Sequence, residues 1–431
     1  MSTAFFVALG ACLLPPLLLR SLRLPTWLPL VFVQLLLGIA LGNDRVDQQL
    51  RLHGIDLAQG ALADALRGIG TLGLCLLVGL SAGDAAAHLH GRQRWRCVPI
   101  SIGGFALAVL GGAALGALLV VHQPALMGPQ AMGPQVMGPR ADGLRFVLAI
   151  GVAMAVTALP VLLAQMAQLG IAASPLGRLA AGAAALDELW LWLALGALLL
   201  PAADGLWRPL AGLLALLAAL AWVVRPGLAA FLRRHAEVSA GERMALGVAV
   251  IALSSAATQA LGLHAALGAF WAGALLPRAL LEAWREPMLA VAQHLLLPFF
   301  FVITGTAIQI DAGNGAFWLL AAAVSAAGIG LKFAASSLAV RATGLPWRDA
   351  CAVGSLLQCK GLMELVAVGL LLQHGLLAPP LAGALAIMTL CSTLATPLLW
   401  QWTRSRRLSS SGLVTASAAR AARPGRAVEP A

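Results

Sequence analysis

Charge is scarce in this chain of 431 residues, of which only 10% are Asp, Glu, Lys or Arg. A soluble domain carries about 25% charged residues, so the composition excludes an ordinary soluble protein. The chain has 60% hydrophobic residues and a mean hydropathy of +0.89, which predicts an all-α polytopic membrane protein. Only two lysines occur, Lys332 and Lys360, and both lie inside apolar segments.

The sequence also lacks the patterns of a disulfide framework, a zinc site or an enzyme. Its six cysteines lie in or at the edge of apolar segments and form no Cys-x-x-Cys pair. We find no His/Cys/Asp metal cluster and no nucleophile–base pair. We therefore expect no enzyme activity, no cofactor and no resident metal. No soluble domain is expected after the last apolar segment, because 403–431 is a short basic tail that we expect to be disordered.

Thirteen apolar stretches approach the length of about 17–25 residues that spans a bilayer. They lie near 4–20, 27–42, 66–82, 97–121, 144–169, 177–200, 206–224, 243–261, 264–276, 291–310, 316–341, 350–374 and 378–402.

The basic residues follow these segments, so the net charge of +11 does not indicate nucleic-acid binding. With the N-terminus outside, 20 of the 26 arginines fall in inner loops and the C-terminal tail. This asymmetry fits the positive-inside rule and predicts a cytoplasmic C-terminus.

Two of the predicted helices are interrupted. The first break is Thr157-Ala158-Leu159-Pro160, within 144–169, and the second is Gln358-Cys359-Lys360-Gly361, within 350–374. The breaks lie in the fifth and twelfth segments, and this odd offset makes the two halves antiparallel. Paired interruptions of this kind predict inverted repeats with two broken helices that cross at the membrane midplane.

Charged and polar residues in the apolar segments lie at matching depths in the predicted membrane. Counting 1.5 Å per residue from the nearest arginine places Asp187 and Lys332 about 14 Å deep, and Thr157 and Lys360 about 18 Å deep. We expect these positions to converge, with Lys332 pairing one carboxylate of the adjacent Asp187 and Glu188.

The carboxylate that Lys332 leaves uncompensated can bind either a proton or a dehydrated monovalent cation, and that competition is the basis of exchange. The alternative is a buried Asp/Lys pair that only fixes packing. Lys360 and Glu364, four residues apart, are expected to neutralise one another, with Lys360 also compensating helix dipoles.

Five blocks together resemble the second branch of the monovalent cation/proton antiporter superfamily, which includes plant-type cation/proton exchangers and bacterial relatives. They are TALPVLLAQMAQLG (157–170), GRLAAGAAALDELWLW (177–192), TQALGLHAALGAFWAGALLP (258–277), LLLPFFFVITG (295–305) and KGLMELVAV (360–368). The resemblance implies that Glu188 is the ion-binding carboxylate, Asp187 the acid before it, Thr157 the residue at the first break and Lys332 the base paired with the two acids.

The resemblance further implies a homodimer of thirteen-helix subunits in a bacterial cytoplasmic membrane, exchanging Na⁺ or K⁺ for H⁺. The transmembrane domain, 1–402, would divide into a dimerisation part (about 1–42 and 206–276) and a mobile core part (about 66–200 and 291–402). The chain departs from the family pattern at Glu188, usually Asp, at Gln358-Cys359, commonly Asn-Thr, and at Gln259, often acidic. Two alternatives stay open, a cation-coupled symporter of small organic anions and a non-transporting sensor on the same fold.

Overall fold

The computed structural model is helical throughout nearly all of the residues that it describes, as the sequence predicts. These residues are 6–7, 9–14, 30–52, 56–57, 60–88, 94–127, 136–199, 207–235, 237–308, 310 and 313–405. Extended pairing within them is limited to one isolated antiparallel bridge between Met137 and Leu377. The predicted first segment, 4–20, is described only over 6–7 and 9–14, and the tail, 403–431, only over 403–405.

The helices follow in chain order, with two π-helical turns, η1 and η2, inserted between α-helices. They are α2 (Leu30–Leu41), α3 (Asp44–Leu52), α4 (Gly60–His88), α5 (Arg94–Met127), α6 (Gly143–Ala155), α7 (Leu159–Gln168), α8 (Pro175–Leu198), α9 (Trp207–Ala219), η1 (Leu220–Val224), α10 (Arg225–Arg234), α11 (Ala240–Ala260), α12 (Ala265–Leu275), α13 (Arg278–Leu281), α14 (Arg285–Val291), η2 (Ala292–Leu296), α15 (Leu297–Thr306), α16 (Gly315–Ala342), α17 (Trp347–Leu357), α18 (Leu362–Gln373) and α19 (Pro379–Ser405).

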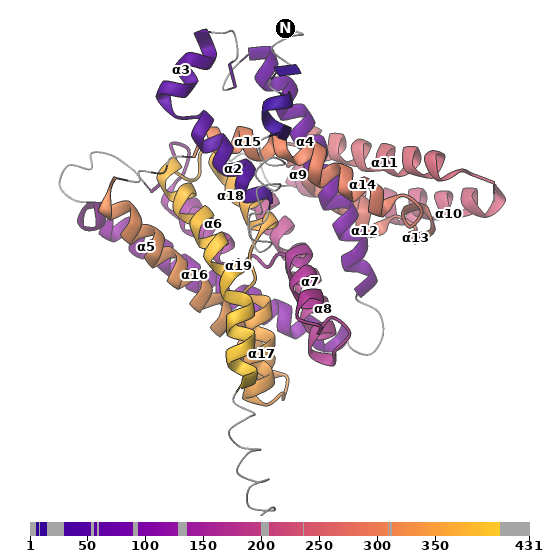
Figure 1. Cartoon of the computed structure of the whole chain (residues 1–431). Coiled ribbons are helices and arrows are strands. Elements are labelled where there is room, and N and C mark those ends of the chain that lie inside the picture. The colour runs from indigo at the N-terminus through magenta and orange to yellow at the C-terminus, as the bar shows by residue number, and fades with distance from the viewer. Residues whose placement is uncertain are drawn as a thin grey trace, which may run out of the picture.

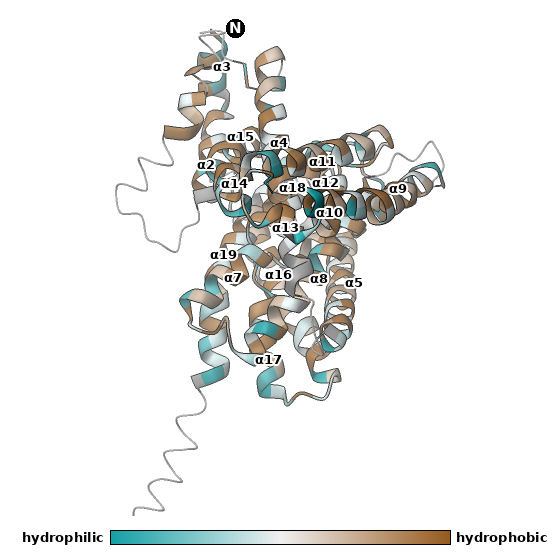
Figure 2. Ribbon diagram, turned by 90° about the vertical axis from the view of Figure 1, so that its right-hand side faces the viewer, coloured by the Kyte–Doolittle hydropathy of each residue, from teal (hydrophilic) through white to brown (hydrophobic). Residues whose placement is uncertain are grey.

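Within the described ranges, nine helices are long and apolar enough to cross a membrane, or ten if the bent pair α17–α18 counts as one span. Helix α12 is apolar but shorter. Hydrophobic residues cover most of the helices, as Figure 2 shows. Predicted segments three to thirteen each correspond to one of these helices or to a consecutive set, so the chain crosses the membrane many times.

The helices pack in two groups. Helix α16 packs against α5, α17 and α19, and α8 packs against α5, α6, α7 and α17. In the second group α4 packs against α11, α12 and α15, and α15 also packs against α2. Figure 1 shows α5 and α16 side by side, while α10 and α11 project to the opposite side of the molecule. The first group contains both predicted breaks.

The second group has a tight seam between α4 and α12. A Cβ atom added at Gly273 would collide with the backbone of Gly79, and one at Gly79 would lie 3.0 Å from the carbonyl oxygen of Ala269. Only glycine permits two backbones to approach this closely. The seam makes α4 and α12 one packed unit.

The segment that precedes α6 is joined by hydrogen bonds to the turn after α18. The Arg140 amide donates to the carbonyl of Gly375 at 2.9 Å, and the Ala378 amide donates to the carbonyl of Val136 at 3.1 Å. The start of α6 and the end of α18 therefore lie at the same end of the bundle. The two broken helices run in opposite directions, as inverted repeats require.

Candidate functional site

The first helix break is produced by Pro160. Proline has no amide hydrogen and clashes with the carbonyl four residues earlier, so it ends the preceding helix but is tolerated in the first turn of the next one. Accordingly α6 ends at Ala155, Val156 and Ala158 adopt extended ψ angles of 137° and 94°, and α7 begins at Leu159. Thr157 lies in the unwound stretch and is 1% exposed.

The second break lies between Leu357 and Leu362, where α17 and α18 meet at a bend of 54°. It contacts the first break directly, because the Ala158 amide donates to the carbonyl of Cys359 at 3.0 Å. A Cβ atom at Gly361 would lie 2.6 Å from Cγ2 of Val161, so glycine permits this approach. The two breaks therefore cross in contact, as predicted.

Asp187 of α8 lies beside this crossing and is held by three side chains from three other segments. Lys332 Nζ of α16 lies 2.8 Å from Oδ2, and Ser101 of α5 donates to Oδ1 at 2.5 Å. Thr157 Oγ1 lies 2.7 Å from Oδ2 and 2.8 Å from the carbonyl oxygen of Leu357. Asp187 is 2% exposed and Lys332 is fully buried. A buried ion pair is tolerable only with additional hydrogen bonds, and Asp187 receives them from Ser101 and Thr157.

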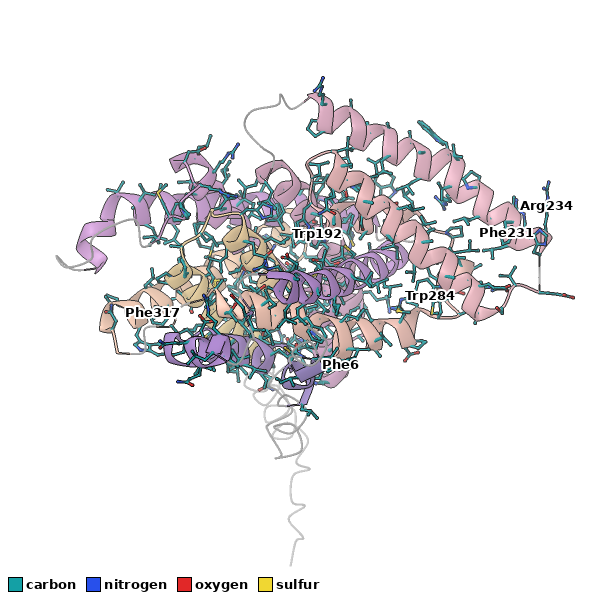
Figure 3. All side chains as sticks on the ribbon, turned by 90° about the horizontal axis from the view of Figure 1, so that it is seen from above. Phe6, Trp192, Phe231, Arg234, Trp284 and Phe317 are labelled. Atoms are coloured by element: carbon teal, nitrogen blue, oxygen red, sulfur yellow. The ribbon has the colours of Figure 1, made fainter. Side chains whose placement is uncertain are left out.

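Glu188 points to a different side of α8. It is 1% exposed, and residues four, seven and eight positions further on share its face of the helix. One of these is Gly196, where an added Cβ would lie 3.1 Å from Leu267 of α12. Another is Trp192, which lies near the middle of the bundle in Figure 3. Asp187 thus faces the first helix group, while Glu188 lies on the face that meets the second.

Lys360 and Glu364 form a separate, fully buried pair, with Nζ 3.0 Å from Oε2. Lys360 Nζ also donates to the carbonyls of Ala153 and Met154, at 2.8 and 3.2 Å, in the last turn of α6. Those carbonyls carry the negative end of the helix dipole, which a cation stabilises. Lys360 therefore pairs with Glu364 and compensates a helix end, as the sequence predicts.

Sequence reasoning missed a row of hydroxyls on α19 that hydrogen-bonds to the second break. Ser392 Oγ lies 2.7 Å from the Gln358 carbonyl and accepts from the Lys360 amide at 3.2 Å. Thr393 donates to the Lys360 carbonyl at 2.7 Å, and Gln358 Nε2 donates to Thr396 at 2.6 Å. Helical spacing of hydroxyls in an apolar segment was the signal available for finding them.

We expect Ser392→Ala to destabilise the protein. The change leaves buried backbone groups of the second break without a partner, which costs about 1–3 kcal/mol per group. Thermal unfolding of the detergent-purified protein measures the loss. Ser325→Ala is the matched control, because the Ser325 hydroxyl is buried and has no hydrogen-bond partner among the described residues. Equal unfolding midpoints for the two variants would contradict this role for Ser392.

Comparison with known proteins identifies the family. The sequence profile of the family described as "Sodium/hydrogen exchanger, transmembrane" matches residues 4–402. The chain belongs to this family. It is a family of membrane exchangers and not of enzymes, as the sequence indicates.

The exchanger relatives include plant proteins, as the resemblance predicts. The chain is 28% identical to Cation/H(+) antiporter 15 of Arabidopsis thaliana over 79% of this chain and 41% of that protein. It is 29% identical to the Na(+)/H(+) antiporter NhaS4 of Synechocystis over 58% of this chain and 63% of that protein. The chain spans about half the length of the curated plant relatives that it matches.

A solved exchanger structure shows the same fold. The sodium proton antiporter MjNhaP1 from Methanocaldococcus jannaschii aligns with a TM-score of 0.63 and 14% identity, covering 92% of this chain and 96% of that one. At this identity the likeness supports the fold alone. It confirms the predicted antiporter-like architecture of inverted repeats with crossing broken helices.

Proposed function

We propose that this chain exchanges a monovalent cation, Na⁺ or K⁺, for H⁺ across a membrane by alternating access. The observation that carries the proposal is the buried cluster of Asp187, Lys332 and Thr157 at the crossing of the two breaks. Ionisable residues inside a membrane domain are costly and usually mark an ion or proton pathway. The names of the relatives include both cations, because one is a Na(+)/H(+) antiporter and another, from Saccharomyces cerevisiae, is a K(+)/H(+) antiporter.

In this mechanism Glu188 is the carrier that a proton and a cation share. A carboxylate that is buried away from water can bind either a proton or a cation, and the two compete for the same oxygen atoms. Asp187 is already engaged by Lys332 and two hydroxyls, which supports a positioning and coupling role for it. Thr157 and the carbonyls freed at the breaks supply further oxygen atoms, the ligands that a hard cation prefers.

The movement that exposes the site is proposed to occur between the two helix groups, in a homodimer whose second group forms the dimer contact. Helix α4 packs against α12, and α15 packs against α2. This packing supports assigning α4 and α15 to the dimerisation part, although the sequence predicts that they belong to the core part. Glu188 would then lie at the boundary between the two helix groups, where one moves relative to the other. We place the protein in a bacterial cytoplasmic membrane, with the N-terminus outside and the C-terminus in the cytoplasm.

Proteoliposomes with an imposed pH gradient test the exchange. We expect addition of Na⁺ or K⁺ to dissipate the gradient, reported by a pH-sensitive dye, and comparison of the two cations to identify the transported ion. A cation-coupled symporter of organic anions would dissipate no proton gradient, and a sensor would move no cation. Either result would overturn the proposal.

A further inference from the structure

A groove at one end of the first helix group lies between α17 and α19. It has a volume of about 310 Å³ and is lined by Trp347, Arg348, Cys351, Trp402 and Thr403. Trp347 and Trp402 are 54% and 53% exposed. Helix α16 ends and α17 begins beside it, at the lower end of the molecule in Figure 1. Half-exposed tryptophans at the ends of membrane helices mark the headgroup level of the bilayer.

Positive charge is in excess around this groove. Arg348 Nη2 donates to the carbonyl of Arg404 at 3.1 Å, while its Nε has no partner within the part of the chain that the structure describes. Arg341 lies over the Trp347 ring, 5.8 Å from its centroid. Asp349 pairs with Arg404 at 3.4 Å, so it compensates one arginine, and no carboxylate of the described residues forms an ion pair with Arg348. An anion placed here would complete the charge balance.

An exposed apolar side chain lies one helical turn from the groove-lining Trp402. Leu398 is 65% exposed and lies one helical turn before Trp402 on α19. Trp347 and Cys351 are likewise one turn apart on α17. Two apolar stripes therefore lead away from the arginines towards the bilayer interior, as a ligand with a charged head and a hydrocarbon tail requires.

We propose that this groove binds an anionic phospholipid, with its phosphate beside Arg348 and an acyl chain along Leu398 and Trp402. Guanidinium groups recognise phosphate oxygens through paired N–H donors, and basic pockets between membrane helices suit anionic headgroups. The site lies on the first helix group, away from the second group that the proposed function assigns to the dimer contact. It is therefore a lipid site distinct from a subunit interface.

Thermal unfolding of the purified full-length protein in detergent micelles tests the proposal. We expect added phosphatidylglycerol to raise the unfolding midpoint by several degrees over the same amount of phosphatidylcholine, and salt to reduce this increment by screening. Arg348→Gln should remove the increment, and Arg348→Lys should keep part of it. Arg178→Gln, which alters an exposed arginine outside the groove, should leave the increment unchanged.

Comparing lipid-dependent increments, rather than absolute midpoints, separates binding from any loss of the Arg348–Arg404 hydrogen bond. An undiminished increment in Arg348→Gln would overturn the proposal. So would a full increment produced by inorganic phosphate alone, since the groove would then hold a soluble anion instead of a lipid. The assay measures no transport, so its outcome is independent of the exchange reaction.

Discussion

Glu188→Gln should reduce cation-driven proton movement in proteoliposomes to the level of protein-free vesicles. The amide has nearly the same shape as the carboxylate but neither takes up a proton nor carries the negative charge that binds a cation. Glu188 is 1% exposed on the face of α8 that meets the second helix group, so the change removes a carboxylate that is shielded from bulk water. The measurement is dye-reported collapse of an imposed pH gradient on adding Na⁺ or K⁺.

The matched control is Glu282→Gln, the same chemical change at an exposed position outside the site. It should transport at the unaltered rate. Glu188→Asp should retain exchange with an altered preference between cations, because removing one methylene withdraws the oxygens from the ion. Normal transport by Glu188→Gln, in vesicles that contain equal amounts of folded protein, would show that the carrier has been assigned to the wrong residue.

Removing the positive partner of Asp187 should damage both stability and transport. In Lys332→Met the carboxylate stays buried with only Ser101 and Thr157 as donors, and breaking one side of a buried ion pair costs about 3–5 kcal/mol. We expect a markedly lower unfolding midpoint and loss of exchange.

A double variant separates the stability effect from the transport effect. Asp187→Asn combined with Lys332→Met removes both charges, so much of the stability should return while transport remains impaired. This comparison distinguishes the coupling role from the alternative of a pair that only fixes packing. If the double variant recovers both stability and full exchange, the pair is purely structural.

The two buried ion pairs could be predicted from the sequence, because depth in the membrane or helical spacing fixes the relative positions of their members. Asp187 and Lys332 lie at equal depth, and the structure places their charged atoms 2.8 Å apart. Lys360 and Glu364 are one helical turn apart and also pair. Whether these residues act in transport stays a prediction. The depth of a residue along a helix can be counted from the sequence, and for this reason contacts of this type could be predicted.

The rotation of each helix about its axis, and which helices are neighbours, could not be predicted in the same way. Ser101 was missed because one serine in an apolar helix carries no signal without the packing of α5 against α8. Assigning α4 and α15 to a helix group likewise requires knowing which apolar faces meet.

The hydrogen bond between the two breaks has a consequence for how this chain tolerates sequence change. Its donor and acceptor are the backbone amide of Ala158 and the backbone carbonyl of Cys359, so neither side chain forms it. The side chain at position 359 can therefore change without loss of this contact between the breaks. Ala158 and Cys359 are both fully buried, so sequence change at these two positions is limited by the volume of the side chain and not by the hydrogen bond that joins the breaks.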